Sequence, residues 1–95
     1  MYAVIFRASI NELSDQYLEQ AKYLRELALN KYGCVEFTSV SEDKQEIAIS
    51  YWEDLESISR WKQDPEHMQA QDLGRTEFYT SYQVQVVDIL RDYKG

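Results

Sequence analysis

Hydrophobic and polar positions change their spacing several times along the 95-residue chain, which divides it into predicted strands and helices. Residues 2–9 are rich in β-branched and aromatic side chains, a composition typical of a strand. Apolar residues then recur at helical spacing, and these are Leu13, Tyr17, Ala21, Leu24 and Ala28. This stripe predicts a helix for which Ser14 is a suitable N-cap, with Gly33 just past its end.

Two predicted strands with a short turn between them follow the first helix. Residues 34–40 and 46–53 have strand composition, and the polar segment 41–45 fits a hairpin turn. Cys34 opens the first of these strands. Because no histidine or basic cluster stands near it in the sequence, it is expected to be a buried structural thiol.

A second helical segment contains the single proline of the chain. Asp54 can cap this helix, whose inward stripe consists of Leu55, Ile58 and Trp61. Pro65 interrupts it, because the proline ring removes a backbone donor and clashes with the preceding turn. A further turn or two over residues 66–73 is expected to end at Gly74, and residues 78–90 form the last predicted strand.

The resulting order, β-α-β-β-α-β, predicts an α+β protein with a ferredoxin-like fold over one domain, residues 1–95. Four antiparallel strands form the sheet, and both helices cover the same face. Right-handed crossovers leave few other topologies.

Both faces of this predicted sheet carry apolar side chains. In the third strand, Ile47 and Ile49 alternate with Ala48 and Ser50, so neither face is clearly polar. Two helices can cover only one face, and soluble monomers rarely expose a large apolar patch. The pattern favours an isologous homodimer packed sheet to sheet. The alternative is a half-exposed sheet with scattered apolar residues.

The charge of the chain limits its partners. Seventeen acidic and ten basic side chains give a net charge of −7, which argues against nucleic acid or an anionic membrane as partner. Residues 42–66 hold eight acids and three bases, a composition typical of a solvated face. One cysteine excludes an internal disulfide. The N-terminal residues lack the features of a signal peptide, so a cytoplasmic location is expected.

A series of short motifs in the second half resembles a known family. The motifs are Ser50-Tyr51-Trp52-Glu53, Ile58, Trp61-Lys62, Pro65-Glu66-His67, Ala70-Gln71, Gly74-Arg75, Phe78-Tyr79 and Tyr82. In joint order and spacing they resemble the antibiotic biosynthesis monooxygenase (ABM) domain family. The resemblance implies a ferredoxin-like fold and a dimeric α+β barrel. Some members oxygenate phenols or quinols with dioxygen and no metal or flavin, and others degrade haem.

Trp61 and His67 are the candidate catalytic residues. The tryptophan that matches Trp61 in oxygenating members lines a pocket, where an indole can stack on a planar substrate. At helical spacing, Trp61 also fits a purely structural core position. His67 is the only histidine, and its ordinary pKa near 6.5 suits it to take a phenolic proton. The alternative for His67 is an exposed residue in the first turn of a helix.

Five further residues are candidates for substrate binding. Tyr51 and Trp52 are adjacent in a strand and therefore lie on opposite faces, one of which meets the helices. Arg75 has Glu53 or Glu77 as expected ion-pair partners. Tyr79 and Tyr82 are predicted to lie on opposite faces of the last strand, where either hydroxyl could meet a phenolate.

Other chemistries have weaker support. The haem-degrading branch has an asparagine on the first strand and a histidine ten residues after the helix tryptophan, where this chain has Gln71, a poor iron ligand. His67 could still ligate iron from one turn earlier. No phosphate loop, dinucleotide fingerprint or nucleophile elbow is present. No metal and no cofactor is therefore expected.

The sequence favours a cofactor-independent monooxygenase that acts on a small aromatic molecule. A non-catalytic dimeric module of the same fold, which binds a small molecule or stabilises an assembly, is the alternative. A pocket that touches both Trp61 and His67 would favour the enzyme, whereas a site filled by core side chains would favour the module.

Overall fold

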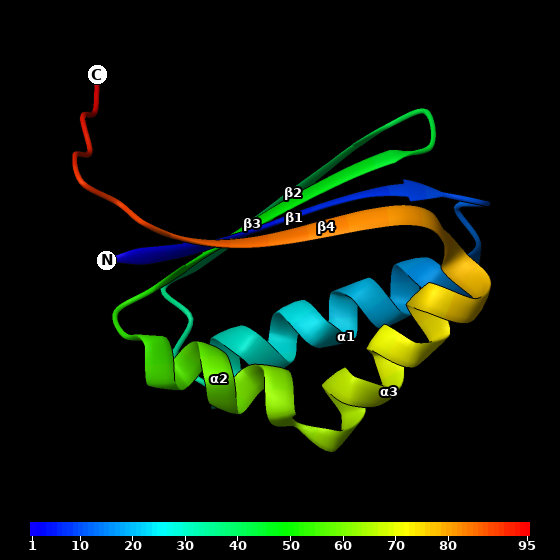
Figure 1. Cartoon of the computed structure of the whole chain (residues 1–95), viewed down its shortest axis with the longest axis horizontal. Helices are drawn as coiled ribbons and strands as arrows, with labels where there is room; N and C mark the ends of the chain where they lie inside the picture. The colour runs from blue at the N-terminus through cyan, green and yellow to red at the C-terminus, as the bar shows by residue number, and fades with distance from the viewer.

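In the computed structural model, which describes residues 1–95, strands and helices alternate as the sequence pattern predicts (Figure 1). The elements are β1 (Tyr2–Ile10), α1 (Asp15–Lys31), β2 (Glu36–Glu42), β3 (Gln45–Trp52), α2 (Leu55–Gln63), α3 (Pro65–Leu73), the π-helical turn η1 (Gly74–Phe78) and β4 (Tyr79–Asp88). None of the helices combines the length and apolarity needed to cross a membrane.

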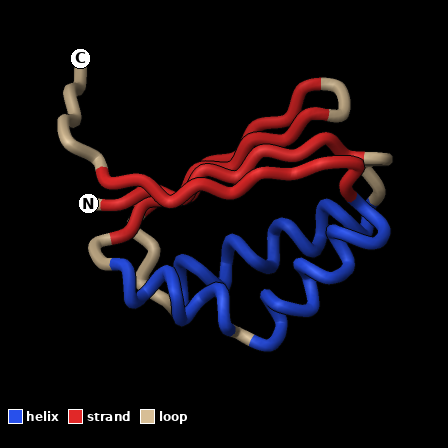
Figure 2. The backbone as a smooth tube through the Cα atoms, viewed as in Figure 1, coloured by secondary structure: helices blue, strands red, loops and turns tan.

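The four strands form one antiparallel sheet in the order β2-β3-β1-β4. All helices lie on the same side of it (Figure 2). In the middle of the sheet, Val4 of β1 pairs with Ser50 of β3 and with Val86 of β4. The predicted ferredoxin-like α+β fold is confirmed.

The predicted start and end of α1 are confirmed. The Ser14 hydroxyl accepts a hydrogen bond from the Tyr17 backbone N–H at 3.1 Å, which satisfies one free donor of the first turn. After the helix, Gly33 has a φ of 77°, a left-handed conformation that favours glycine. The following strand begins at Glu36 rather than Cys34. The thiol of Cys34 lies in the hydrophobic core, and burial raises its pKa.

The break between α2 and α3 is built around Asp64 and Pro65. Pro65 occupies the first turn of α3, where its missing N–H costs nothing. Asp64 caps that helix by accepting from the Glu66 backbone N–H at 2.9 Å. Its other oxygen accepts from the Tyr32 hydroxyl at 2.5 Å, which holds the Asp64 pKa below its usual range. Asp64 is buried, so segment 42–66 is not the uniformly solvated face that its composition predicts.

The predicted end of α3 at Gly74 is confirmed, but the helical structure does not stop there. Gly74 has helical dihedrals, and the chain continues as η1 to Phe78 before β4 begins at Tyr79. A Cβ at position 74 would collide with the Tyr79 ring. Glycine at this position therefore follows the last residue of α3 and is also required by close packing.

Strand β4 contains an extra residue near its start, which corrects the predicted orientation of its tyrosines. Ser9 of β1 pairs with Ser81, whereas the next residue, Ile10, pairs with Tyr79, so Thr80 has no partner of its own. Such a bulge changes the alternation of side chains along a strand. As a result Tyr79 and Tyr82 share one face, with ring centroids 5.7 Å apart.

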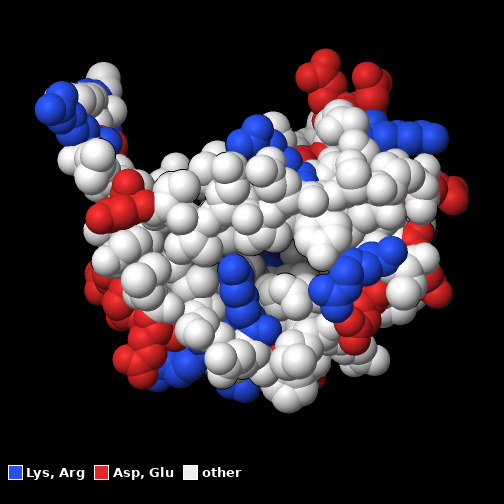
Figure 3. All heavy atoms as spheres, in the orientation of Figure 1, with Lys and Arg blue, Asp and Glu red and all other residues white.

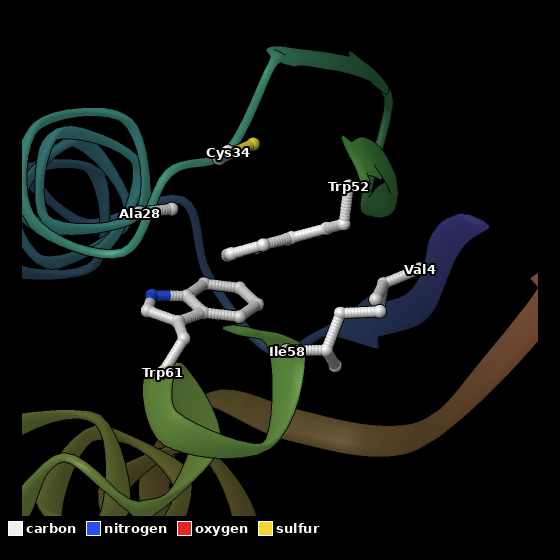
Figure 4. Close-up of a cluster of buried hydrophobic side chains, with 6 residues drawn as sticks. All are labelled: Val4, Ala28, Cys34, Trp52, Ile58 and Trp61. Atoms are coloured by element: carbon white, nitrogen blue, oxygen red, sulfur yellow. The ribbon is translucent and has the colours of Figure 1, made fainter. Parts of the chain in front are cut away.

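The helix-covered face of the sheet forms the core. One cluster surrounds Trp52, whose side chain is 0% exposed, and contains Val4, Ala28, Cys34, Ile58 and Trp61 (Figure 4). A second cluster, toward the other end of the sheet, contains Ala8, Ile10, Tyr17 and Phe78. Trp52 and Trp61 lie with ring centroids 5.2 Å apart and join α2 to the sheet.

The opposite face of the sheet, here called the outer face, has no helix over it (Figure 2). The pairing register places a row of apolar side chains on this face, namely Ala3, Ile5, Ile47, Ile49, Tyr51 and Val87. Val40 of β2 belongs to the same face and is 60% exposed. Arg7 lies on the same face, opposite Ile47, and donates to the Gln85 side-chain oxygen at 2.8 Å. The outer face thus carries an apolar row beside polar residues such as Gln83 and Gln85, and neither face is clearly polar, as the alternation predicts.

Candidate functional site

A cavity of about 410 Å³ lies between the sheet and the helices. Figure 3 shows its opening between the sheet layer and the helices below it. All four strands, the three α-helices and η1 contribute to its wall. Fourteen of its 24 lining residues are hydrophobic, so the cavity suits a small, largely apolar molecule.

Trp61 and His67 lie together in the wall of this cavity. Trp61 is near the end of α2 and His67 is in the first turn of α3. The change of direction between the two helices at Asp64 lets the two rings meet. Their centroids are 4.3 Å apart, with the rings nearly perpendicular at 71°. The structure thus brings the two candidate catalytic residues into one pocket.

Each of these residues carries a buried nitrogen that has no hydrogen-bond partner. These nitrogens are Nε1 of Trp61 and Nδ1 of His67, and each of the two residues is 6% exposed. Burying a polar group without a partner costs about 1–3 kcal/mol. Unsatisfied groups of this kind are rare in folded proteins, which makes these two the first candidates for a polar contact with a ligand in the adjoining cavity.

Burial changes the acid–base behaviour of His67. Removal from water, with a smaller contribution from the positive charge of Lys62, lowers its pKa from 6.5 to about 4. The imidazole is therefore neutral at pH 7 and ready to accept a proton. It is a weaker base than the ordinary pKa of histidine leads one to expect from the sequence.

Three of the five predicted substrate-binding residues also line the cavity: Arg75, Tyr79 and Tyr82. Arg75 forms its ion pair with Asp72, one turn earlier, and not with the expected Glu53 or Glu77. Burial raises the pKa of Tyr79 to about 12, so its hydroxyl remains protonated at neutral pH and can donate a hydrogen bond.

The other two predicted substrate-binding residues lie outside the cavity wall. Of the adjacent pair Tyr51 and Trp52, it is Trp52 that faces the helices. Its side chain is completely buried, and its indole N–H donates to the Ser50 hydroxyl at 2.8 Å. Tyr51 is on the outer face, opposite Ala3 of β1. Within one chain, neither side chain reaches the cavity.

Sequence analysis missed a carboxylate in the cavity wall. Glu46 of β3 is 7% exposed and accepts a hydrogen bond from the Ser41 hydroxyl of β2. Its negative charge contributes to the raised pKa values of Tyr17 and Tyr79, so it lies at their end of the cavity. Strand alternation contains the signal, because Glu46 shares a face with Trp52.

No three histidine, cysteine, aspartate or glutamate side chains come together as a group that could hold a metal ion. Gln71, which stands where the haem-degrading branch has its histidine, lines the cavity. His67 is the only imidazole in the wall.

Solved structures share this fold. No family model matches the chain. Among solved structures, SnoaB, a cofactor-independent oxygenase from Streptomyces nogalater, has a TM-score of 0.81 at 13% identity, covering 96% of this chain and 94% of that one. An antibiotic biosynthesis monooxygenase has a TM-score of 0.78 at 16% identity, covering 96% of this chain and all of the other. The chain therefore has the ferredoxin-like α+β fold of these proteins.

Sequence comparison identifies the family. The chain is 36% identical over 91 residues to the uncharacterized protein YqjZ of Bacillus subtilis (strain 168), covering 95% of this chain and 80% of that protein. It is 33% identical over 90 residues to the jasmonate monooxygenase ABM of Pyricularia oryzae, but covers 42% of that protein's length. The chain belongs to the antibiotic biosynthesis monooxygenase family.

Proposed function

We propose that the protein is a cofactor-independent monooxygenase that oxidises a small aromatic phenol or quinol with dioxygen. The observation that carries the proposal is that Trp61 and His67, each with a buried nitrogen that has no hydrogen-bond partner, both line an apolar cavity. An ABM-family chain with this pair has both a surface for a planar ring and a base beside it. The structural similarity to a cofactor-independent oxygenase supports the same chemistry.

The proposed reaction needs no external reductant. His67 accepts the phenolic proton, and the electron-rich anion gives one electron to dioxygen. The resulting superoxide and substrate radical combine, which forms a carbon–oxygen bond. The O–O bond of this peroxide then breaks as its carbon loses its remaining hydrogen, so that one oxygen becomes a carbonyl and the other leaves as water. Four electrons leave the substrate, and four reduce dioxygen.

The side chains around the cavity have separate parts in this proposal. The indole of Trp61 packs against the ring, and its N–H stabilises the developing phenolate oxygen. Lys62 contributes a positive charge near the same end of the cavity, since this charge lowers the pKa of His67. Tyr79 donates a hydrogen bond, because its raised pKa keeps the hydroxyl protonated.

Oxygen uptake tests the proposal. We expect the purified protein, with no added cofactor, to consume one dioxygen for each molecule of an anthrone that it converts to the corresponding anthraquinone. Trp61→Phe keeps an aromatic ring but removes the N–H, so kcat/KM is expected to fall at least tenfold, because a hydrogen bond to a charged group contributes about 1.5–3 kcal/mol. Arg60→Gln, outside the cavity, is the matched control and should leave the rate unchanged.

The second candidate function is a non-catalytic dimeric module that binds the same class of molecule. The low pKa of His67, which makes it a weak base, is the observation that favours this alternative. Binding of phenols in the cavity, without oxygen uptake above the buffer rate for any of them, would contradict the oxygenase and support the module.

We further propose that a second copy of the chain covers the outer face of the sheet. The apolar row of this face would then be buried by an isologous contact, the simplest way to remove a large exposed patch. A homodimer packed in this way would have one cavity in each subunit.

Light scattering at micromolar concentration should give the mass of a dimer. Ile49→Glu places a charge in the middle of the outer face and is expected to shift the protein to a monomer, because burying an unpaired charge is costly. Lys22→Glu changes a residue of α1 on the opposite side of the sheet and should remain dimeric. A monomeric wild-type protein would contradict the proposed dimer.

A further inference from the structure

The charge of the cavity wall is opposite to that of the whole molecule. The chain has a net charge of −7, yet one acidic side chain, Glu46, and four of the ten basic side chains line the cavity. The four are Lys22, Arg25, Lys62 and Arg75. Basic side chains are visible beside the opening in Figure 3, whereas acidic side chains lie mostly toward the periphery of that view.

Three of these cations have no acidic partner. Arg75 is paired with Asp72, but no carboxylate lies within 4.0 Å of the charged groups of Lys22, Arg25 or Lys62. The first two come from α1 and the third from α2. Unpaired charges of one sign around a concave, low-dielectric site focus the electric field and raise the local concentration of oppositely charged molecules.

The charge is also unequal between the two ends of the cavity. Lys62 lies at the end occupied by Trp61 and His67, since its charge acts on the imidazole. Glu46 lies at the end occupied by Tyr17 and Tyr79. An anionic group is attracted to the first end and repelled from the second, so the difference orients a charged ligand as well as attracting it.

We propose that the cavity binds an amphipathic organic anion, with its carboxylate at the three unpaired cations and its apolar ring among side chains such as Phe6, Phe37 and Val84. The inference rests on the proposed function, because it assumes that the cavity is the substrate site. It adds the charge of the substrate, which neither the fold nor the Trp61–His67 pair specifies.

The geometry favours a small carboxylate over a larger polyanion. The wall is mostly apolar and encloses about 410 Å³, a volume suited to one small molecule. The net charge of −7 repels nucleic acids and anionic membranes at long range. The unpaired cations line the cavity, so a ligand small enough to enter it gains most from their charge.

Two fluorescent probes with the same ring system isolate the effect of the charge. The titrations use 6-hydroxy-2-naphthoate and 2-naphthol at pH 7, and they measure binding without any turnover. At low salt we expect the naphthoate to bind about fivefold more tightly, the size given by several partly exposed ion pairs together. The preference should shrink toward one as added salt screens the charges.

Substitutions locate the effect in the wall. Arg25→Gln combined with Lys62→Gln is expected to reduce the naphthoate preference to about one, with the affinity for 2-naphthol unchanged. Lys44→Gln, in the turn between β2 and β3, removes the same type of charge outside the cavity and should leave the preference intact. The salt dependence of the unmodified protein gives the same information if the double variant does not fold.

The outcomes separate this inference from the proposed function. Equal affinities for the two probes would overturn the preference for an anion, while oxygen uptake with neutral phenols would leave the oxygenase proposal standing. Binding of neither probe would overturn both the inference and the cavity as a binding site. A naphthoate preference without oxygen uptake would support the anion site and contradict the oxygenase.

Discussion

Replacing Trp52 by alanine is expected to lower the free energy of unfolding by about 3–5 kcal/mol. The indole is 0% exposed and lies between the sheet and α2, against Trp61 at a centroid distance of 5.2 Å. The substitution removes this contact and leaves a cavity that the rigid sheet cannot close. It also removes the hydrogen bond from the indole N–H to the Ser50 hydroxyl.

Urea unfolding followed by circular dichroism measures the loss. Trp52→Phe retains most of the ring and should cost less than the alanine substitution. Leu55→Ala is the matched control, because Leu55 begins the neighbouring helix and is 51% exposed, so its loss should stay below about 1 kcal/mol. Equal losses for Trp52→Ala and Leu55→Ala would show that the two-tryptophan contact does not hold α2 to the sheet.

Acidification from pH 6.5 to pH 4 is expected to remove about 3 kcal/mol of stability through His67 alone. In the unfolded chain the imidazole takes up its proton near pH 6.5, whereas in the folded protein its pKa is about 4. Between these values the unfolded state binds more protons. The contribution of the neutral His67 imidazole to the free energy of unfolding is therefore complete above pH 6.5. It is lost as the pH falls through the folded pKa.

The difference between wild type and His67→Gln isolates this contribution from the carboxylates that also titrate in this range. We expect the two free energies of unfolding, measured in urea at several pH values, to converge or cross as the pH falls. Lys62 lowers the His67 pKa and Asp64 raises it. Lys62→Gln should therefore bring the folded pKa closer to the unfolded value and narrow the pH range over which stability is lost. Parallel curves between pH 7 and pH 4 would contradict the buried, neutral imidazole.

Most of the fold follows from the spacing of apolar residues, because each element has a strong local signal. Ser14 and Asp54 mark helix starts, and the helix break at Pro65 follows from the chemistry of the proline ring. The ends of elements are less predictable. Gly74 ends α3, but the chain continues as η1, and the Tyr79 ring leaves no room for a side chain at position 74, a contact that spacing alone does not identify.

The site is only partly visible in the sequence. Trp61 and His67 could be selected because their residue types and their family match point to chemistry, and the structure brings them together. The pKa of His67 could not be predicted, since it depends on how completely neighbouring elements exclude water. Glu46 was hidden in an acidic segment whose overall composition suggests solvent, although strand alternation turns this one carboxylate inward.

The extra residue at the start of β4 has a consequence for related chains. Because Thr80 has no partner across the ladder, two tyrosines separated by three positions lie on the same wall. In a regular strand only residues an even number of positions apart share a wall. An odd interval between two aromatic residues at the entry to the final strand, in another family member, would therefore signal the same irregularity and two rings in the cavity wall.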